Sequence, residues 1–175
     1  MRFTKLHGAG NDYLVIDGRD MERDWTAVTR RMTERHFGVG SDGLLVVASS
    51  QVAAIRMRVF NPDGSEAEMS GDGIRCFTKY VVDRDIAKLE GGFLKVETGN
   101  GVRAVIPIRE HGRVTGARVD MGKPRLRPEE VPVLLPPGVN VEGPLVDYPL
   151  LLERQAVAVT CVSMGTPHAA TFIEE

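Results

Sequence analysis

The sequence predicts an α+β protein with many short strands and few helices. Short apolar runs separated by turn residues recur along the whole chain, which is typical of strands. Two longer stretches, residues 25–36 and 74–84, instead carry apolar residues at helical spacing. A chain of 175 residues with 42% hydrophobic residues is long enough for one domain, or for one domain and part of another.

The first 60 residues predict two pairs of strands with one helix between the pairs. A turn rich in Gly and Asn at residues 7–12 separates the first two strands. Trp25, Val28 and Met32 recur at helical spacing, which predicts a surface helix over residues 25–36. The strands of this part are predicted at residues 3–6, 13–16, 44–48 and 54–60.

The middle of the chain predicts a central helix followed by a hairpin. The Asn-Pro-Asp-Gly-Ser run at residues 61–65 is a strong turn signal. Ile74, Phe77 and Val81 share one face of the helix predicted over residues 74–84, so we expect that face to be buried. Asn100-Gly101 predicts a tight hairpin between the runs that flank it. The strands of this part are predicted at residues 93–98, 102–108 and 114–121.

The last third of the chain differs in composition from the rest. Seven of the ten prolines fall within residues 123–149, which indicates the edge of a second domain. Strands are predicted at residues 156–162 and 170–173, with a turn over residues 163–168 between them.

Charge and composition exclude several classes of function. The net charge of −2 and the isoelectric point near 6.1 do not favour nucleic acid or an anionic membrane as a partner. No apolar run approaches the roughly 18 residues that span a bilayer, and the charged N-terminus does not resemble a signal peptide. Two cysteines are too few for a disulfide scaffold, so we expect a cytoplasmic protein.

Residues 38–43, GVGSDG, match the G-x-G-x-x-G pattern of dinucleotide-binding proteins in letters only. The pattern binds pyrophosphate where a helix follows it, and here an apolar strand follows. Residues 8–13, GAGNDY, also precede a strand. Both runs therefore predict tight glycine turns near a ligand rather than a nucleotide site.

The run AEMSGDGIRC, residues 67–76, places Ser70 in a glycine-rich turn that opens the central helix. A helix N-terminus offers unpaired N–H groups and partial positive charge, which suit a carboxylate or a developing anion. Serine is also a good N-cap, so the run supports either a reactive residue or a plain cap.

Three further polar residues are candidates for a binding site. Asn11 and Asn61 lie in turns, where an asparagine amide can hold an amino-acid head group or serve the turn itself. His168 ends the last turn and either tunes a neighbouring acid–base group or is structural. Cys76 lies within the predicted central helix and Cys161 within a predicted strand, so we expect both to be small buried apolar residues.

Four segments together resemble the diaminopimelate epimerase family. They are FTKLHGAGNDYLVID, HFGVGSDGLLVV, FNPDGSEAEMSGDGIRCFTKYV and VSMGTPH, and their order and spacing agree with that family over essentially the whole chain.

The resemblance implies two similar domains, each with a curved, mainly antiparallel sheet around a central helix. Residues 1–115 correspond to the first domain and residues 116–175 to the beginning of the second. The substrate is expected between the domains. The resemblance also implies that the second domain's helix, with a second catalytic cysteine, lies beyond Glu175.

The resemblance implies a cofactor-free epimerase that interconverts LL- and meso-diaminopimelate for lysine and cell-wall synthesis. One cysteine thiolate removes the α-proton and a second thiol returns a proton to the opposite face. Ser70 stands at the first cysteine position, and His168 matches a histidine that influences the acid–base pair. The substrate-binding positions are Asn11, Asn61, Gly71, Asp72 and Thr166. The family also implies a homodimer whose partner is a small amino-acid substrate.

Three departures from the family pattern leave alternatives open. Ser70 replaces a cysteine, and its hydroxyl is a far weaker acid than a thiol. Asp72 and Thr166 each replace an asparagine, and the Asp72 carboxylate would repel a substrate carboxylate unless it faces away. The alternatives are an epimerase or racemase of another amino acid, or a binding homologue or fragment without catalysis.

Overall fold

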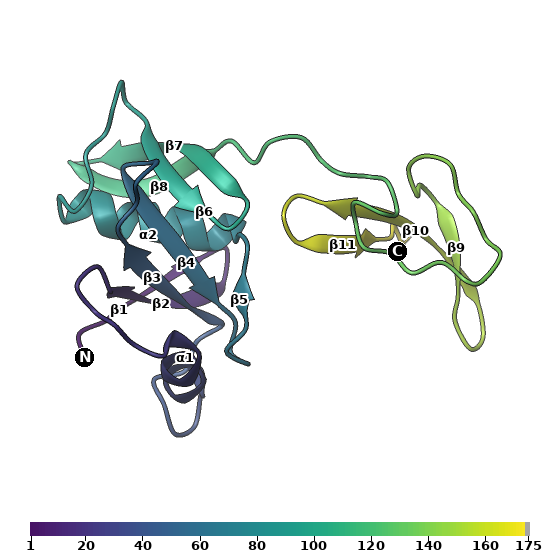
Figure 1. Ribbon diagram of the computed structural model, residues 1–175, viewed down its shortest axis with the longest axis horizontal. Helices are drawn as coiled ribbons and strands as arrows, with labels where there is room; N and C mark the ends of the chain where they lie inside the picture. The colour runs from purple at the N-terminus through teal and green to yellow at the C-terminus, as the bar shows by residue number, and fades with distance from the viewer. Residues whose placement is uncertain (174–175) are drawn as a thin grey trace. The chain divides into compact units, whose positions relative to one another are not determined.

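The computed structural model describes residues 1–173 and divides the chain into two compact units, Met1–Met121 and Gly122–Glu175. Figure 1 shows the elements of both. No helix among the described residues is long and apolar enough to cross a membrane.

A strongly curved mixed sheet forms the first unit. Its strand order is β1-β2-β3-β4-β6-β7-β8, with β5 paired to β4. The β2/β3 and β4/β6 pairs are parallel, and the other neighbours are antiparallel. The strands are β1 Thr4–Gly8, β2 Asn11–Asp17, β3 Gly43–Ala48, β4 Ile55–Phe60, β5 Glu66–Ala67, β6 Leu94–Thr98, β7 Gly101–Glu110 and β8 Arg113–Val119.

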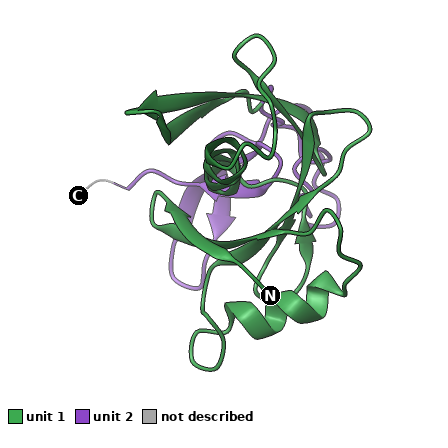
Figure 2. Ribbon diagram, turned by 90° about the vertical axis from the view of Figure 1, so that its left-hand side faces the viewer, with its two compact units in different colours: residues 1–121 green, residues 122–175 purple. Residues whose placement is uncertain are grey.

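The helix α2, Gly71–Asp83, lies inside the curve of this sheet, as the end-on view in Figure 2 shows. Its apolar face packs against strand residues that include Val15, Leu45 and Val96, all fully buried. This confirms the predicted central helix. The helix begins three residues before the predicted start. The prediction missed the first turn because Gly-Asp-Gly has no apolar residue at helical spacing.

The other face of the sheet is covered by α1, Trp25–Thr33, which is capped by Asp24. Alternate residues of β2 and β3 point to opposite faces, so Leu14 and Val46 pack with Trp25, while Val15 and Leu45 face α2. Both faces of these central strands are therefore buried, which explains why residues 13–16 and 44–47 read as unbroken apolar runs.

Two predicted hairpins are confirmed, with tighter turns than expected. Gly8 pairs with Asn11, so only Ala9 and Gly10 connect β1 to β2, where a six-residue turn was predicted. Thr98 pairs with Gly101, so Gly99 and Asn100 connect β6 to β7. Gly116, at the predicted domain boundary, lies inside β8 and pairs with Ile108, five residues before the first unit ends at Met121.

The second unit contains an antiparallel sheet of order β11-β10-β9, and no helix is found within residues 122–173. Its strands are β9 Tyr148–Leu151, β10 Ala156–Ser163 and β11 Pro167–Ala170. The strand predicted at residues 170–173 was wrong. The reversal after β10 occupies only residues 164–166, so pairing with β10 begins at Pro167 and ends at Ala170.

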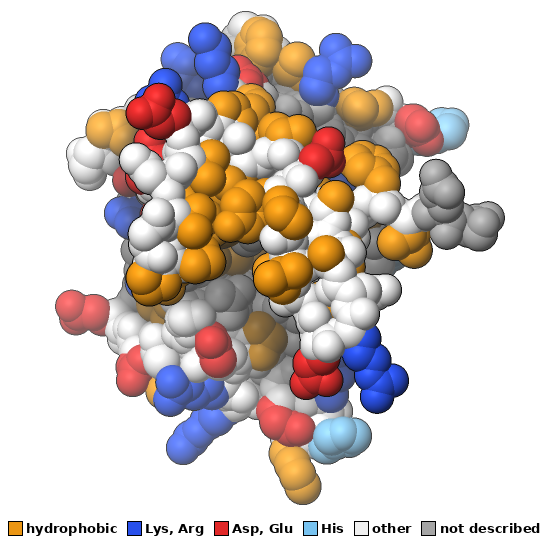
Figure 3. All heavy atoms as spheres, turned by 90° about the vertical axis from the view of Figure 1, so that its right-hand side faces the viewer, with side chains coloured by type: hydrophobic (Ala, Val, Ile, Leu, Met, Phe, Trp, Pro, Cys, Tyr) orange, Lys and Arg blue, Asp and Glu red, His pale blue; other side chains and the backbone are white. Residues whose placement is uncertain are grey.

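A small core of this unit joins Val131, Leu145, Val159 and Cys161. Other apolar side chains stay exposed, and Figure 3 shows apolar side chains gathered on its surface. The exposed large ones are Leu134, Val139, Val146, Leu150, Leu151, Leu152, Phe172 and Ile173.

Candidate functional site

Ser70 is the N-cap of α2. Its backbone is extended, with φ −141° and ψ 121°, and its Oγ accepts a hydrogen bond from the Gly73 N–H at 2.9 Å. The Ser70 carbonyl accepts from the Ile74 N–H at 2.9 Å. Within residues 1–173, the N–H groups of Gly71 and Asp72 have no acceptor from the protein. Two donors and the positive end of the helix are therefore available to an anion beside Ser70.

Tyr13 is the second partner of Ser70 and was not predicted from the sequence. Its hydroxyl lies 2.9 Å from Ser70 Oγ, although the two residues are 57 positions apart. The tyrosine is 7% exposed, and burial raises the pKa of its hydroxyl above the ordinary value. A buried tyrosine hydroxyl needs a hydrogen-bond partner. A tyrosine within an apolar strand could therefore have indicated that a polar residue lies nearby.

Asp72 faces two residues of the first unit and does not cap the helix. Its Oδ2 accepts from the Asn11 side-chain amide at 2.9 Å, and its Oδ1 forms an ion pair with Arg75. Arg75 partly offsets the carboxylate charge. Asn11, predicted to hold the substrate, thus has its side-chain N–H₂ directed at Asp72, while its carbonyl oxygen has no donor among the described residues.

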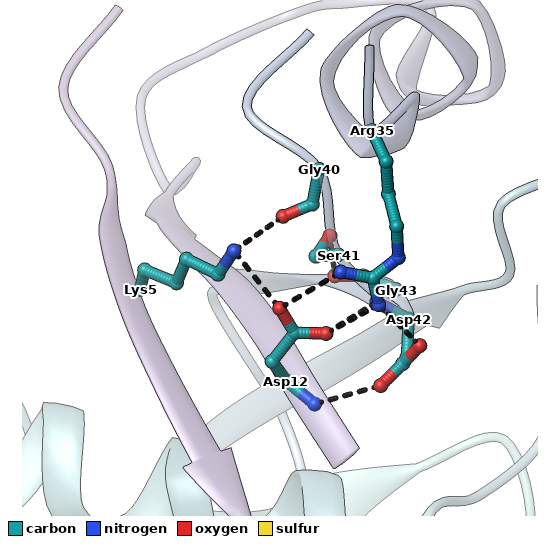
Figure 4. Close-up of polar contacts among 7 residues, drawn as sticks. All are labelled: Lys5, Asp12, Arg35, Gly40, Ser41, Asp42 and Gly43. Carbon is teal, nitrogen blue, oxygen red and sulfur yellow. Dashed lines mark hydrogen bonds and ion pairs between the residues drawn. The ribbon is translucent and has the colours of Figure 1, made fainter. Parts of the chain in front are cut away.

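A charged cluster fixes the loop of residues 38–43 against the β1–β2 hairpin (Figure 4). Asp12 pairs with Lys5 and with Arg35, each at 2.9 Å, and Arg35 also pairs with Asp42 at 2.7 Å. Lys5 donates to the Gly40 carbonyl at 2.7 Å. Burial opposes ionisation of Asp12, but the hydrogen bonds from Arg35 and Lys5 outweigh it and hold its pKa well below the ordinary value. The cluster thereby fixes the backbone beside Asn11.

Asn61 lies in the exposed turn between β4 and β5. Its side-chain amide donates to Ser65 Oγ at 3.0 Å, and its backbone N–H donates to the Ser65 carbonyl at 2.9 Å. The structure therefore gives the Asn61 amide a partner inside its own turn. No hydrogen bond among residues 1–173 joins it to Ser70 or Asp72.

Thr166 and His168 belong to the second unit. Thr166 is exposed in the turn between β10 and β11, where Ser163 Oγ accepts from the Gly165 N–H at 3.2 Å. His168 is exposed on β11 opposite Val162. The structure thus brings Ser70, Gly71, Asp72 and Asn11 together in the first unit and places Thr166 and His168 in the other.

Two further observations concern metals and thiols. Among residues 1–173, no group of three His, Cys, Asp or Glu side chains is placed to hold a metal ion. Cys76 and Cys161 are both buried, as predicted, and burial raises the pKa of the Cys76 thiol.

The family assignment comes from sequence comparison. The family profile described as Diaminopimelate epimerase matches residues 3–127. The chain belongs to the diaminopimelate epimerase family. A diaminopimelate epimerase of Moorella thermoacetica is 44% identical over 177 residues, covering 100% of this chain and 61% of that protein. One of Methanococcus maripaludis is 41% identical, covering 99% of this chain and 61% of that protein. The chain thus spans less than two thirds of the length of these family members.

Solved structures support the family's fold. A hydroxyproline epimerase from Agrobacterium vitis matches with a TM-score of 0.71 at 13% identity, over 97% of this chain and 50% of that one. A PhzF-family phenazine biosynthesis protein from Bacillus anthracis matches with a TM-score of 0.58 at 19% identity, over 97% and 55%. At these identities the likeness concerns the fold alone, which is the α+β fold predicted for the family.

Proposed function

We propose that this protein is a diaminopimelate epimerase, which interconverts LL- and meso-diaminopimelate by proton transfer at the α-carbon. The observation that carries the proposal is Ser70 at the start of α2, beside the N–H groups of Gly71 and Asp72. Relatives named diaminopimelate epimerase, 41–44% identical over nearly the whole chain, support it.

The start of α2 would bind the substrate's α-carboxylate. Two N–H donors and the helix dipole stabilise an anion there, and they stabilise it more as charge develops on the carboxylate once the α-proton leaves. Ser70 Oγ is anchored at the same helix end, so it can reach the α-carbon of a carboxylate bound to these amides. Inversion needs a second acid–base group on the opposite face of that carbon, and we assign none among residues 1–173.

The remaining attributes of the proposal come from the family resemblance. Asn11, Asn61, Gly71, Asp72 and Thr166 are the proposed substrate positions, and His168 the residue that tunes the acid–base pair. Residues 1–115 are proposed as the first epimerase-like domain and 116–175 as part of the second. We also propose a cytoplasmic homodimer acting in lysine biosynthesis.

A specific contact favours a second candidate, an epimerase or racemase of another amino acid. The Asn11 amide donates to Asp72, which leaves a carboxylate and the Asn11 carbonyl oxygen as acceptors beside the helix start. Acceptors suit an ammonium or hydroxyl group of a ligand better than a second carboxylate.

The deciding experiment is exchange of the α-hydrogen in deuterated water, followed by mass spectrometry on the full-length protein. LL-diaminopimelate and a panel of other amino acids are compared, with Ser70→Cys and Ser70→Ala alongside. Exchange of diaminopimelate by the wild type supports the first proposal, and exchange of another amino acid alone supports the second. If the wild type shows no exchange and Ser70→Cys exchanges rapidly, the serine at position 70 is a loss-of-function change. If all variants are silent on every substrate, both proposals fail, and calorimetry then tests whether the protein is a binding homologue.

A further inference from the structure

The contact between Tyr13 and Ser70 is built into the first unit by the sheet. Tyr13 Oη lies 2.9 Å from Ser70 Oγ, and Ser70 is the sole hydrogen-bond partner of this hydroxyl among the described residues. The ring comes from β2 and the serine from the start of α2, so the contact joins the sheet to the reactive end of the helix.

Two glycines keep space for this contact. Gly43 is the β3 partner of Tyr13, and a Cβ there would lie 3.2 Å from the tyrosine ring and 2.9 Å from the Phe60 carbonyl oxygen. A Cβ on Gly73 would lie 2.9 Å from Ser70 Oγ. A side chain at either position would push the tyrosine ring or the serine out of place.

Two hydrogen bonds at Ser70 Oγ limit the directions that are open to the serine proton. A serine hydroxyl has one proton to donate and two lone pairs to accept with. The Gly73 N–H occupies one lone pair of Ser70 Oγ. Burial keeps the Tyr13 phenol protonated by raising its pKa, so it can donate to the second lone pair. With the phenol as donor, Ser70 is free to direct its own proton in a third direction.

We propose that Tyr13 is the positioning residue of this site: it directs the Ser70 proton toward the substrate and re-protonates Ser70 when that proton leaves. The proposal rests on the proposed epimerase function. As the substrate carbanion forms a C–H bond, the Ser70 O–H bond breaks, the Tyr13 proton moves to Ser70 Oγ, and the negative charge ends on the Tyr13 phenolate. In the reverse direction the same protons return.

This relay explains how a serine can stand where the family has a cysteine. A serine hydroxyl is a far weaker acid than a thiol, whose ordinary pKa is near 8.5. A phenol has an ordinary pKa near 10, and even with its pKa raised by burial Tyr13 remains a stronger acid than an aliphatic hydroxyl. With Tyr13 behind Ser70, the charge left after proton delivery rests on a phenolate and not on an alkoxide.

The first test combines Tyr13→Phe with Ser70→Cys in the full-length protein and measures α-hydrogen exchange. Tyr13→Phe should lower the rate of the Ser70 enzyme by roughly 10²-fold or more, as for loss of an acid–base group. In the Ser70→Cys background the loss should be at least tenfold smaller, because a thiol needs no relay. Tyr80→Phe, a buried tyrosine of the same unit, is the control and should leave the rate unchanged. Equal losses in both backgrounds would overturn the relay and indicate packing alone.

The second test does not need a substrate. The chain has three tyrosines, and Tyr13→Phe assigns the Tyr13 signal in a ¹³C NMR titration of the ring carbon that bears oxygen. Ser70→Ala should raise the Tyr13 pKa further, because the bond to Ser70 lowers it. An unchanged titration would overturn the proposal. If this titration shifts while no variant exchanges diaminopimelate, the Tyr13–Ser70 contact stands and the proposed function fails.

Discussion

The side-chain amide of Asn11 donates to Asp72 Oδ2 over 2.9 Å, across 61 positions of sequence. The contact places a carboxylate within the predicted substrate site, next to helix N–H groups that attract an anion. We therefore expect Asp72 to compete with a carboxylate ligand for the same positive environment.

Asp72→Asn should tighten binding of a dicarboxylate amino acid. Two like charges about 4 Å apart repel by about 1 kcal/mol in water, so removing one corresponds to roughly fivefold in affinity. Calorimetric titration with LL-diaminopimelate measures the change. Glu68→Gln, an exposed neighbour, removes an equal charge outside the contact and should have no such effect. Weaker binding by Asp72→Asn would instead show that Asp72 holds a cationic group of the ligand.

Ser70→Asn separates capping from catalysis. Asparagine caps helices as well as serine does, so unfolding in urea should be unchanged, while exchange of the α-hydrogen should be lost with the hydroxyl proton. Ser70→Ala should lose exchange and also about 1 kcal/mol of unfolding free energy. If Ser70→Asn exchanges as fast as the wild type, Ser70 is only a cap.

Ser70→Cys should create a reactive thiol. A helix N-terminus lowers a thiol pKa, whereas the Cys76 thiol is buried and its pKa is raised. Labelling with a thiol reagent at pH 7, read by peptide mass spectrometry, should modify residue 70 much faster than Cys76. The wild type supplies the background rate for Cys76. Equal labelling of both positions would show that the helix end does not activate the thiol.

Asp12→Asn should destabilise the first unit by about 2 kcal/mol, because it removes a charge-assisted bond to Lys5 or Arg35. The folded-state pKa of Asp12 lies below its ordinary value of 3.8, so its contribution is complete above that value. It is lost as the pH falls from there toward the folded-state pKa. Between pH 7 and pH 2, the unfolding temperature should fall less in the variant than in the wild type.

The matched control for the Asp12 experiment is Asp20→Asn. Asp20 is an exposed carboxylate for which the structure gives no hydrogen bond or ion pair within residues 1–173. Asp20→Asn should change neither the unfolding temperature at pH 7 nor its fall between pH 7 and pH 2. If the unfolding temperature of Asp12→Asn falls as much between pH 7 and pH 2 as that of the wild type, the cluster does not stabilise the protein.

Gly43→Ala should lower the free energy of unfolding by about 1–3 kcal/mol through overpacking, because the new Cβ would contact the Phe60 carbonyl oxygen and the Tyr13 ring. Gly116→Ala is the control in another strand of the same sheet, where the nearest side-chain atom would be 3.7 Å from the new Cβ. Urea unfolding should separate the two variants. Similar stability for both would mean that Tyr13 has room to move, which would weaken its proposed positioning role.

Local patterns were sufficient to predict most elements. The α2 helix is visible as Ile74, Phe77 and Val81 at helical spacing, and each hairpin is visible from turn residues next to extended runs. These signals depend on neighbours within a few positions. Turn lengths and the placement of β11 were less accurate, because pairing register is decided by the partner strand.

The sequence by itself determined the family, the central helix and the position of Ser70 at its start. Only the tertiary structure decided what surrounds Ser70. Tyr13 and Asn11 reach the helix start across 57 and 61 positions, because the curved sheet carries β2 past the N-terminus of α2. Hydrogen bonds depend on distances of about 3 Å between atoms, and no local pattern of residues encodes such distances between remote segments.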